Sequence, residues 1–130
     1  MSAISRDELD RMVLDFTDAF NRDDLEGVMN YFSDDAIYDE FNGVRHTGKD
    51  AIQAAFEPMF SGKMGQIRFL EEDRFLDPET GKAMISWTCT LETKRGPAGW
   101  RGLDLLYFSE GQLVAKHTYA KAKTPLLDER

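Results

Sequence analysis

The chain has few residues of the types that build disulfides, metal sites or membrane spans. Cys89 is the only cysteine, which excludes an internal disulfide and a thiol pair for zinc. The two histidines do not form a metal-binding motif: His46 is expected to be solvated or to lie over a pocket mouth, and His117 to face away from the pocket. We therefore expect neither a metal nor a cofactor. The first residues, MSAISRDELDRM, lack the apolar run of a signal peptide or membrane span, so a cytoplasmic protein is expected.

Basic residues are also scarce relative to acidic ones. Sixteen Lys and Arg residues stand against 24 Asp and Glu residues, and the net charge of -8 repels nucleic acid backbones and anionic membrane surfaces. We expect neither as a partner. The apolar content of 42% and the nine phenylalanines indicate a folded core, and 130 residues are enough for one domain, 1–130.

Helical spacing of apolar residues marks the first part of the chain. Ser5 and Glu8 have the three-residue spacing of a capping box, and the apolar residues that follow recur every three or four positions, which predicts a helix over 6–21. A short second helix is expected to carry four apolar residues on one face and to end at the polar cluster 33–35. These four residues are Leu25, Val28, Met29 and Phe32.

The following segments alternate between extended and helical patterns. A strand is predicted over 36–41, a polar loop over 42–48 and a third helix over 49–60. From Ile67 onward, stretches of alternating apolar residues separated by turn-forming residues predict an antiparallel meander. Its strands are expected at 67–76, 83–94, 100–109 and 112–121. This order of elements predicts an α+β fold, with a curved sheet and helices gathered on one of its faces.

A single acid, Asp104, interrupts the segment WRGLDLLYF, which otherwise has the pattern of a buried strand. Alternation places Asp104 on the same face as Trp100 and Phe108. Because burial of an unpaired carboxylate is strongly unfavourable, Asp104 is expected to be paired, to be neutral, or to lie at the edge of a wet cavity.

Three segments carry a resemblance to a known family. FTDAFNRDDLEGVMNYFSDDAIYDEF, HTGKDAI and WRGLDLLYFSEGQLVAKHTY, in this order of elements, closely resemble the SnoaL-like group of the NTF2-like superfamily over about 6–122. The resemblance implies an NTF2-like (cystatin-like) cone, in which a curved, mostly antiparallel sheet wraps around three N-terminal helices and encloses an apolar pocket. It also implies a homodimer formed through the outer face of the sheet, where Leu103, Leu105 and Tyr107 form an apolar series.

Ketosteroid isomerases are the relatives whose catalytic groups can be carried over by position. The resemblance places Glu40 at their general-base carboxylate and Asp104 at their hydrogen-bond-donating acid. Two tyrosines of that family are replaced by Phe16 and Phe56, and Thr118 stands where epoxide hydrolase relatives have an aspartate. The residues expected to contact the substrate are Phe16, Tyr38, Phe56, Trp87, Trp100, Phe108 and Lys116.

Lys116 leaves two alternatives open for Asp104. A neutral Asp104 would donate a hydrogen bond to an enolate oxygen while Glu40 takes the proton, which is acid/base chemistry of an isomerase or cyclase acting on a carbonyl compound. A Lys116 side chain beside it would instead keep Asp104 ionised in an ion pair. The sequence therefore predicts a protein that binds a small apolar molecule, either as a cofactor-independent enzyme or as a non-catalytic ligand-binding or dimerisation module.

Overall fold

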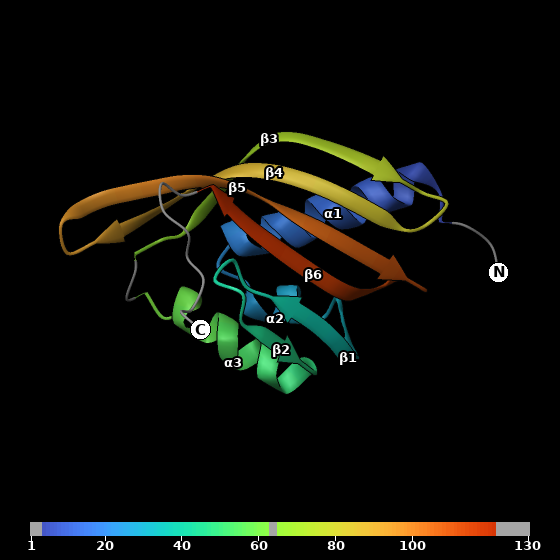
Figure 1. The fold of residues 1–130 in the computed structure, drawn as a ribbon, viewed down its shortest axis with the longest axis horizontal. Coiled ribbons are helices and arrows are strands. Elements are labelled where there is room, and N and C mark those ends of the chain that lie inside the picture. Colours follow the sequence, from blue (N-terminus) through green and yellow to red (C-terminus); the bar gives the residue numbers. More distant parts are fainter. Residues whose placement is uncertain (1–3, 63–64, 122–130) are drawn as a thin grey trace.

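The computed structural model (Figure 1) describes residues 4–62 and 65–121 of the chain. Within these residues three helices and six strands form one helical layer and one sheet. In chain order the elements are α1 (Arg6–Asn21), α2 (Leu25–Met29), β1 (Phe32–Asp39), β2 (Arg45–Thr47), α3 (Lys49–Phe60), β3 (Arg68–Asp77), β4 (Lys82–Thr93), β5 (Gly96–Ser109) and β6 (Gln112–Lys121).

The first helix begins and ends where the spacing predicts. Ser5 caps it, because its hydroxyl accepts a hydrogen bond of 3.1 Å from the backbone N–H of Glu8. One face of α1 is buried and supplies Phe16 and Phe20 to the core. The third helix also has the predicted bounds and contains Pro58 within its last turn.

The sheet has the strand order β2-β1-β6-β5-β4-β3. The four C-terminal strands pair antiparallel with their sequence neighbours, so the predicted meander is confirmed. Strand β1 lies beside β6 and runs parallel to it, with Tyr38 opposite Lys116. This single parallel pair makes the sheet mixed, and it brings the N-terminal half of the chain against the last strand.

Three of the predicted boundaries were wrong. Phe32 and the polar cluster Ser33–Asp35 belong to β1 rather than to the end of the second helix, because Phe32 pairs with Leu113 of β6. The polar loop contains strand β2, which pairs with β1 as a hairpin. Strand β5 begins at Gly96, so the residues after it extend the β4–β5 hairpin instead of forming a turn.

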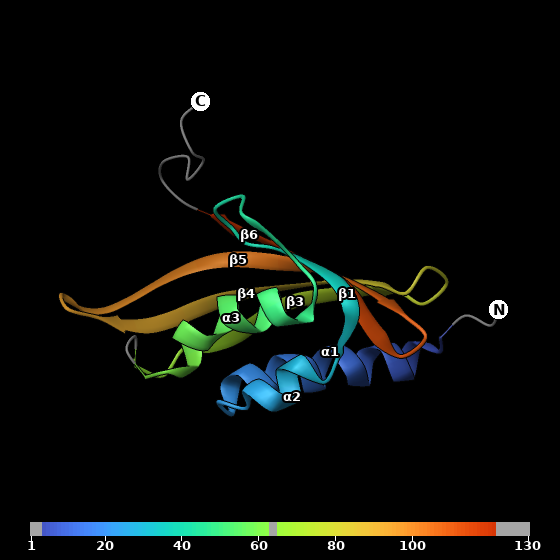
Figure 2. The same ribbon diagram turned by 90° about the horizontal axis from the view of Figure 1, so that it is seen from below.

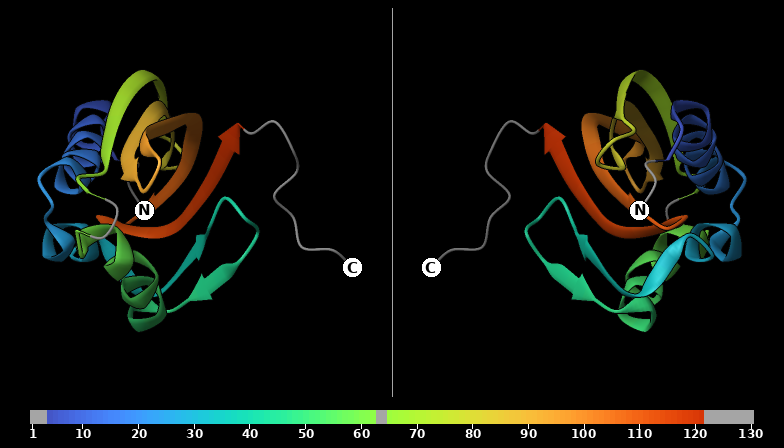
Figure 3. Two further views of the ribbon diagram at one scale, coloured as in Figure 1. Left: turned by 90° about the vertical axis from the view of Figure 1, so that its left-hand side faces the viewer. Right: turned by 90° about the vertical axis from the view of Figure 1, so that its right-hand side faces the viewer.

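The sheet is strongly curved, and all three helices lie on its concave face. Figure 2 shows α1, α2 and α3 together on one side of the sheet, and Figure 3 shows the sheet curling around them. Helix α1 packs against β3 and β4, while α3 packs against β1 and β2. This arrangement is the α+β cone that the sequence predicts. None of the helices in the described part of the chain is long and apolar enough to cross a membrane.

An ionic cluster on the outer face links three strands. Asp39 of β1 accepts hydrogen bonds of 2.6 and 2.9 Å from Arg45 of β2, and its Oδ2 lies 2.8 Å from Nδ1 of His117 on β6. His117 thus faces away from the concave side, as expected. The hydrogen bonds from Arg45 lower the pKa of Asp39 and His117 lowers it further, while burial opposes them.

This cluster predicts a loss of stability in acid. A carboxyl group whose pKa is lower in the folded state stabilises the fold above its unfolded pKa, and this contribution disappears as the pH falls through the folded pKa. Asp39→Asn is therefore expected to be less stable than the wild type at pH 7, and the difference is expected to shrink as the pH falls below the unfolded pKa toward the lowered folded pKa of Asp39. Urea unfolding across this pH range measures the difference. The control is Glu79→Gln, an exposed carboxylate in the β3–β4 turn, and a constant gap between Asp39→Asn and wild type would contradict the prediction.

Candidate functional site

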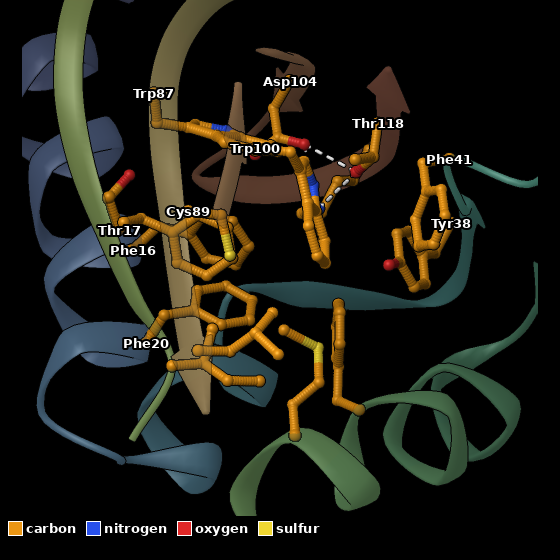
Figure 4. Close-up of a pocket in the computed structure, with 16 residues that line it drawn as sticks. Phe16, Thr17, Phe20, Tyr38, Phe41, Trp87, Cys89, Trp100, Asp104 and Thr118 are labelled. Atoms are coloured by element: carbon orange, nitrogen blue, oxygen red, sulfur yellow. Dashed lines mark hydrogen bonds and ion pairs between the residues drawn. The ribbon is translucent and has the colours of Figure 1, made fainter. Parts of the chain in front are cut away.

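A cavity of about 190 Å³ lies between the helices and the concave face of the sheet (Figure 4). Most of its wall is apolar and aromatic. Both layers of the cone contribute: α1 and α3 from one side, β1 and the meander from the other. The lining residues are Phe16, Thr17, Phe20, Tyr38, Phe41, Phe56, Met59, Ile67, Phe69, Trp87, Cys89, Leu91, Trp100, Asp104, Lys116 and Thr118.

One end of the cavity is polar, and Asp104 is at its centre. Its Oδ1 lies 3.0 Å from Nζ of Lys116 and accepts a hydrogen bond of 2.6 Å from Thr118. Its Oδ2 accepts a hydrogen bond of 3.1 Å from the indole N–H of Trp87. Asp104 is 8% and Lys116 5% exposed, so this is a buried ion pair whose carboxylate accepts three hydrogen bonds.

Gly102 allows Trp87 to reach Asp104. The two residues Trp87 and Gly102 are opposite each other on β4 and β5. A Cβ atom at position 102 would lie 2.6 Å from the Trp87 ring and 2.4 Å from the carbonyl oxygen of Tyr119. The missing side chain therefore leaves space for the indole ring to lie across β5 and donate to the carboxylate two pairs further along.

Aromatic rings surround the ammonium group of Lys116. Nζ lies 4.6 Å from the centre of the Tyr38 ring, and the rings of Phe56 and Phe20 are 5.8 and 5.9 Å away. Contacts of a cation with ring faces partly replace the lost hydration of the ammonium group. Burial raises the pKa of the Tyr38 phenol above its ordinary value, and the charges of Asp104 and Glu40 raise it further. The Tyr38 hydroxyl therefore remains protonated across the physiological range.

Glu40 lies in the β1–β2 turn and is paired with a histidine. Its Oε2 is 2.6 Å from Nε2 of His46, and both side chains are about a quarter exposed. The His46 ring stacks on Tyr38 with 5.7 Å between the ring centres. Glu40 is not among the residues that line the cavity, although it is close enough for its charge to act on the Tyr38 phenol.

The structure brings most of the predicted site residues together. Two predicted residues, Glu40 and Phe108, do not line the cavity. Phe108 lies two residue pairs beyond Leu106 along β5, and there it borders a different groove, on the surface near the N-terminus of α1. The predicted residues that line the cavity are Phe16, Tyr38, Phe56, Trp87, Trp100, Asp104 and Lys116.

Sequence reasoning missed two features of the site. The first is the hydrogen bond from Thr118, which lies opposite Asp104 on β6 and is the second donor to its Oδ1. Alternation places Thr118 on the same face of the last strand as Lys116, which was the available signal for a contact with Asp104. The second is the contact of Glu40 with His46. It depends on the β1–β2 hairpin, which was not predicted because this segment is polar and has the composition of a loop.

Cys89 is a buried thiol in the cavity wall. Burial, together with the charge of Asp104, raises its pKa to about 11, so the thiol is protonated at neutral pH and reacts slowly. Among the described residues, no group of three or more His, Cys, Asp or Glu side chains is arranged to hold a metal ion.

Comparisons with known proteins place this chain in a family. The SnoaL-like domain family matches residues 13–116. A search of the curated proteins found no match.

Solved structures share the fold at low sequence identity. A candidate polyketide cyclase from Xanthomonas campestris pv. campestris has a TM-score of 0.78 and 17% identity, with 89% of this chain and 92% of that chain covered. An NTF2-like protein of unknown function from Burkholderia pseudomallei K96243 has a TM-score of 0.75 and 19% identity, with coverages of 93% and 92%. A protein of unknown function with a cystatin-like fold from Methylobium petroleophilum PM1 has a TM-score of 0.77 and 17% identity, with coverages of 95% and 82%. The chain therefore belongs to the SnoaL-like domain family and has the NTF2-like, cystatin-like fold.

Proposed function

We propose that the chain binds a small, mostly apolar molecule in the cavity between the helices and the sheet. The observation that supports this proposal is the cavity itself, an aromatic space of about 190 Å³ with one polar end. Ligand sites are commonly apolar cavities with a few convergent polar groups. The Asp104–Lys116–Thr118 group would contact the polar atom of such a ligand, and the rings opposite would pack on its apolar part.

Naphthalene provides a direct test of binding. The only two tryptophans of the chain, Trp87 and Trp100, both line the cavity, so their two indole N–H signals in NMR spectra report on its occupancy. Naphthalene is expected to shift both signals and to slow modification of the Cys89 thiol. Cys89→Phe, which fills the cavity, is expected to abolish the shifts of the indole signals. The control is Thr88→Phe, which adds the same ring on the opposite face of β4, and unchanged spectra of the wild type would contradict the proposal.

Acid/base chemistry in the same cavity is a second proposal. Glu40 would take a proton next to a carbonyl group as a cofactor-independent isomerase or cyclase does, and the group around Asp104 would hold the carbonyl oxygen. The supporting observation is that Tyr38 connects the two acids: its ring lies 4.6 Å from Nζ of Lys116, the partner of Asp104, and stacks on His46, the partner of Glu40.

Hydrogen exchange distinguishes this proposal from a non-catalytic binding module. If the cavity is catalytic, protons next to the carbonyl of 1-tetralone should exchange in D₂O faster with the protein than in buffer. Glu40→Gln should then slow the exchange by about 100-fold or more, while Glu79→Gln should not. Binding without faster exchange would favour the non-catalytic alternative.

We also propose that two copies of the chain pair through the outer face of the sheet. Leu70, Phe75 and Tyr119 on this face are each more than half exposed. They extend the partly exposed series Leu103, Leu105 and Tyr107. Sets of exposed apolar side chains of this kind mark interaction surfaces.

Tyr119→Lys tests this dimer. The substitution places a charge on each side of the proposed interface, so it is expected to convert a dimer into a monomer in sedimentation or light scattering. Leu14→Lys, on the exposed side of α1, serves as the control and should leave the mass unchanged. A wild-type protein that is monomeric at high concentration would contradict the proposal.

A further inference from the structure

Among the described residues, two oxygen acceptors serve the three hydrogens of the Lys116 ammonium group, so one hydrogen has none. Two of the hydrogens are donated to Oδ1 of Asp104 and to Oγ1 of Thr118, at 3.0 and 2.6 Å. The remaining surroundings of Nζ are the rings of Tyr38, Phe20 and Phe56. A ring face is a weaker partner for an N–H than an oxygen atom, so a ligand oxygen would improve the contacts of this group.

Trp100 supplies a second unused donor. Within the described part of the chain its indole nitrogen has no hydrogen-bond acceptor, and its ring contacts Phe41 with 6.0 Å between centres. Trp100 lines the same cavity as Lys116, Asp104 and Thr118 (Figure 4). A ligand whose acceptor is held by Lys116 would therefore share the cavity with a neutral donor as well.

Asp104 and Thr118 have little accepting capacity left. A carboxylate has about four lone-pair sites, and Asp104 already accepts from Lys116, Thr118 and Trp87. The Thr118 hydroxyl donates its only hydrogen to Asp104 and accepts from Lys116. A ligand that brings hydrogen-bond donors finds few partners, and a cationic ligand is repelled by Lys116.

The volume of the cavity limits the size of the ligand. It is about 190 Å³, somewhat larger than an apolar cavity of about 150 Å³ that holds benzene. One ring or two fused rings fit this space, whereas a three- or four-ring skeleton does not. Rings such as Phe56 and Trp87, with less than 5% exposure, leave little freedom for expansion.

We propose that the cavity selects a neutral molecule of one or two rings that carries a hydrogen-bond acceptor and no donor, with Lys116 and Trp100 determining this preference. The inference rests on the proposed ligand-binding function and specifies the chemical class of its ligand. Apolar walls supply the affinity for the rings, and the two unused N–H groups supply the discrimination between polar substituents.

Three two-ring probes of similar shape test the proposal: tetralin, 1-tetralone and 1-aminotetralin. NMR titrations of the two indole N–H signals should show 1-tetralone binding at least about tenfold tighter than tetralin, since hydrogen bonds to charged groups are strong. The protonated amine should bind weakest. The Trp100 indole signal should move further downfield with the ketone than with tetralin, and this comparison needs no variant.

A variant assigns the preference to Lys116. Lys116→Met is expected to reduce the ratio of ketone to hydrocarbon affinity to nearly one, whereas Lys82→Met, an exposed lysine of β4, should leave it unchanged. If Lys116→Met does not fold, the test rests on the wild type alone, through the indole shifts caused by 1-tetralone and by tetralin. Equal affinities for ketone and hydrocarbon, or tight binding of the three-ring anthrone, would overturn this inference while leaving ligand binding intact. Absence of binding by all probes would instead overturn the proposed function.

Discussion

Asp104→Asn is expected to lower the free energy of unfolding by about 3–5 kcal/mol, because it leaves Lys116 buried with an uncompensated charge. The pair is almost inaccessible to solvent, with side chains 11% and 6% exposed, so water cannot replace the lost carboxylate. The asparagine retains the shape and an oxygen acceptor for Trp87, which isolates the loss of charge from a loss of packing. Urea unfolding followed by circular dichroism measures the change.

The matched variant for this experiment removes both charges. Asp104→Leu combined with Lys116→Met replaces the pair by apolar side chains, and buried ion pairs replaced in this way often retain their stability. We therefore expect the double variant to be more stable than Asp104→Asn. A stability of Asp104→Asn within about 0.5 kcal/mol of the wild type would mean that Lys116 does not depend on this carboxylate.

Phe56→Ala is expected to cost about 3–5 kcal/mol and at the same time to change which ligands bind. The Phe56 ring is fully buried, lies 4.6 Å from the Tyr38 ring between centres and forms part of the cavity wall. Its removal enlarges the cavity, so anthrone, with three rings, should bind the variant and is not expected to bind the wild type. Urea unfolding and NMR titration of the indole signals measure the two effects.

Phe32→Ala is the control for this prediction. Phe32 is also fully buried and contacts Phe56, with 6.0 Å between ring centres, but it does not line the cavity. The Phe32→Ala variant should lose a similar amount of stability, but it should still bind only ligands of one or two rings, like the wild type. If both variants accepted anthrone equally, general loosening of the core rather than the shape of the cavity would set the size limit.

Local sequence patterns were sufficient wherever an element depends mainly on its own residues. The bounds of α1 follow from its cap and its apolar spacing, and those of α3 from apolar spacing; both agree with the structure. Alternation in β5 identified Asp104 as an acid on a buried face before any partner was known. Helix caps, helical spacing and strand alternation each involve residues that are close together in the chain, so they can be recognised without knowledge of the tertiary structure.

Contacts between distant segments were beyond these patterns. The start of β1 was missed because it pairs with β6, more than 70 residues away: Phe32 pairs with Leu113, and Asp39 contacts His117. Strand β2 was missed although it pairs with the neighbouring β1, because its short sequence is polar. The placement of Glu40 beside His46 follows from the β1–β2 hairpin. Spacing within one strand says nothing about which strand lies next to it or in which register.

The sequence by itself determined the class of fold, the family resemblance, the unusual acid in β5 and most of the aromatic residues that surround it. Only the tertiary structure decided that Asp104 is bound to Lys116, Thr118 and Trp87, that Glu40 pairs with His46 instead of lining the cavity, and that the cavity has the volume of one or two rings. The physical reason is that periodicity decides which face a side chain occupies, whereas the partners of a buried charge and the space left by packed rings depend on strand register and on side-chain packing across the whole core.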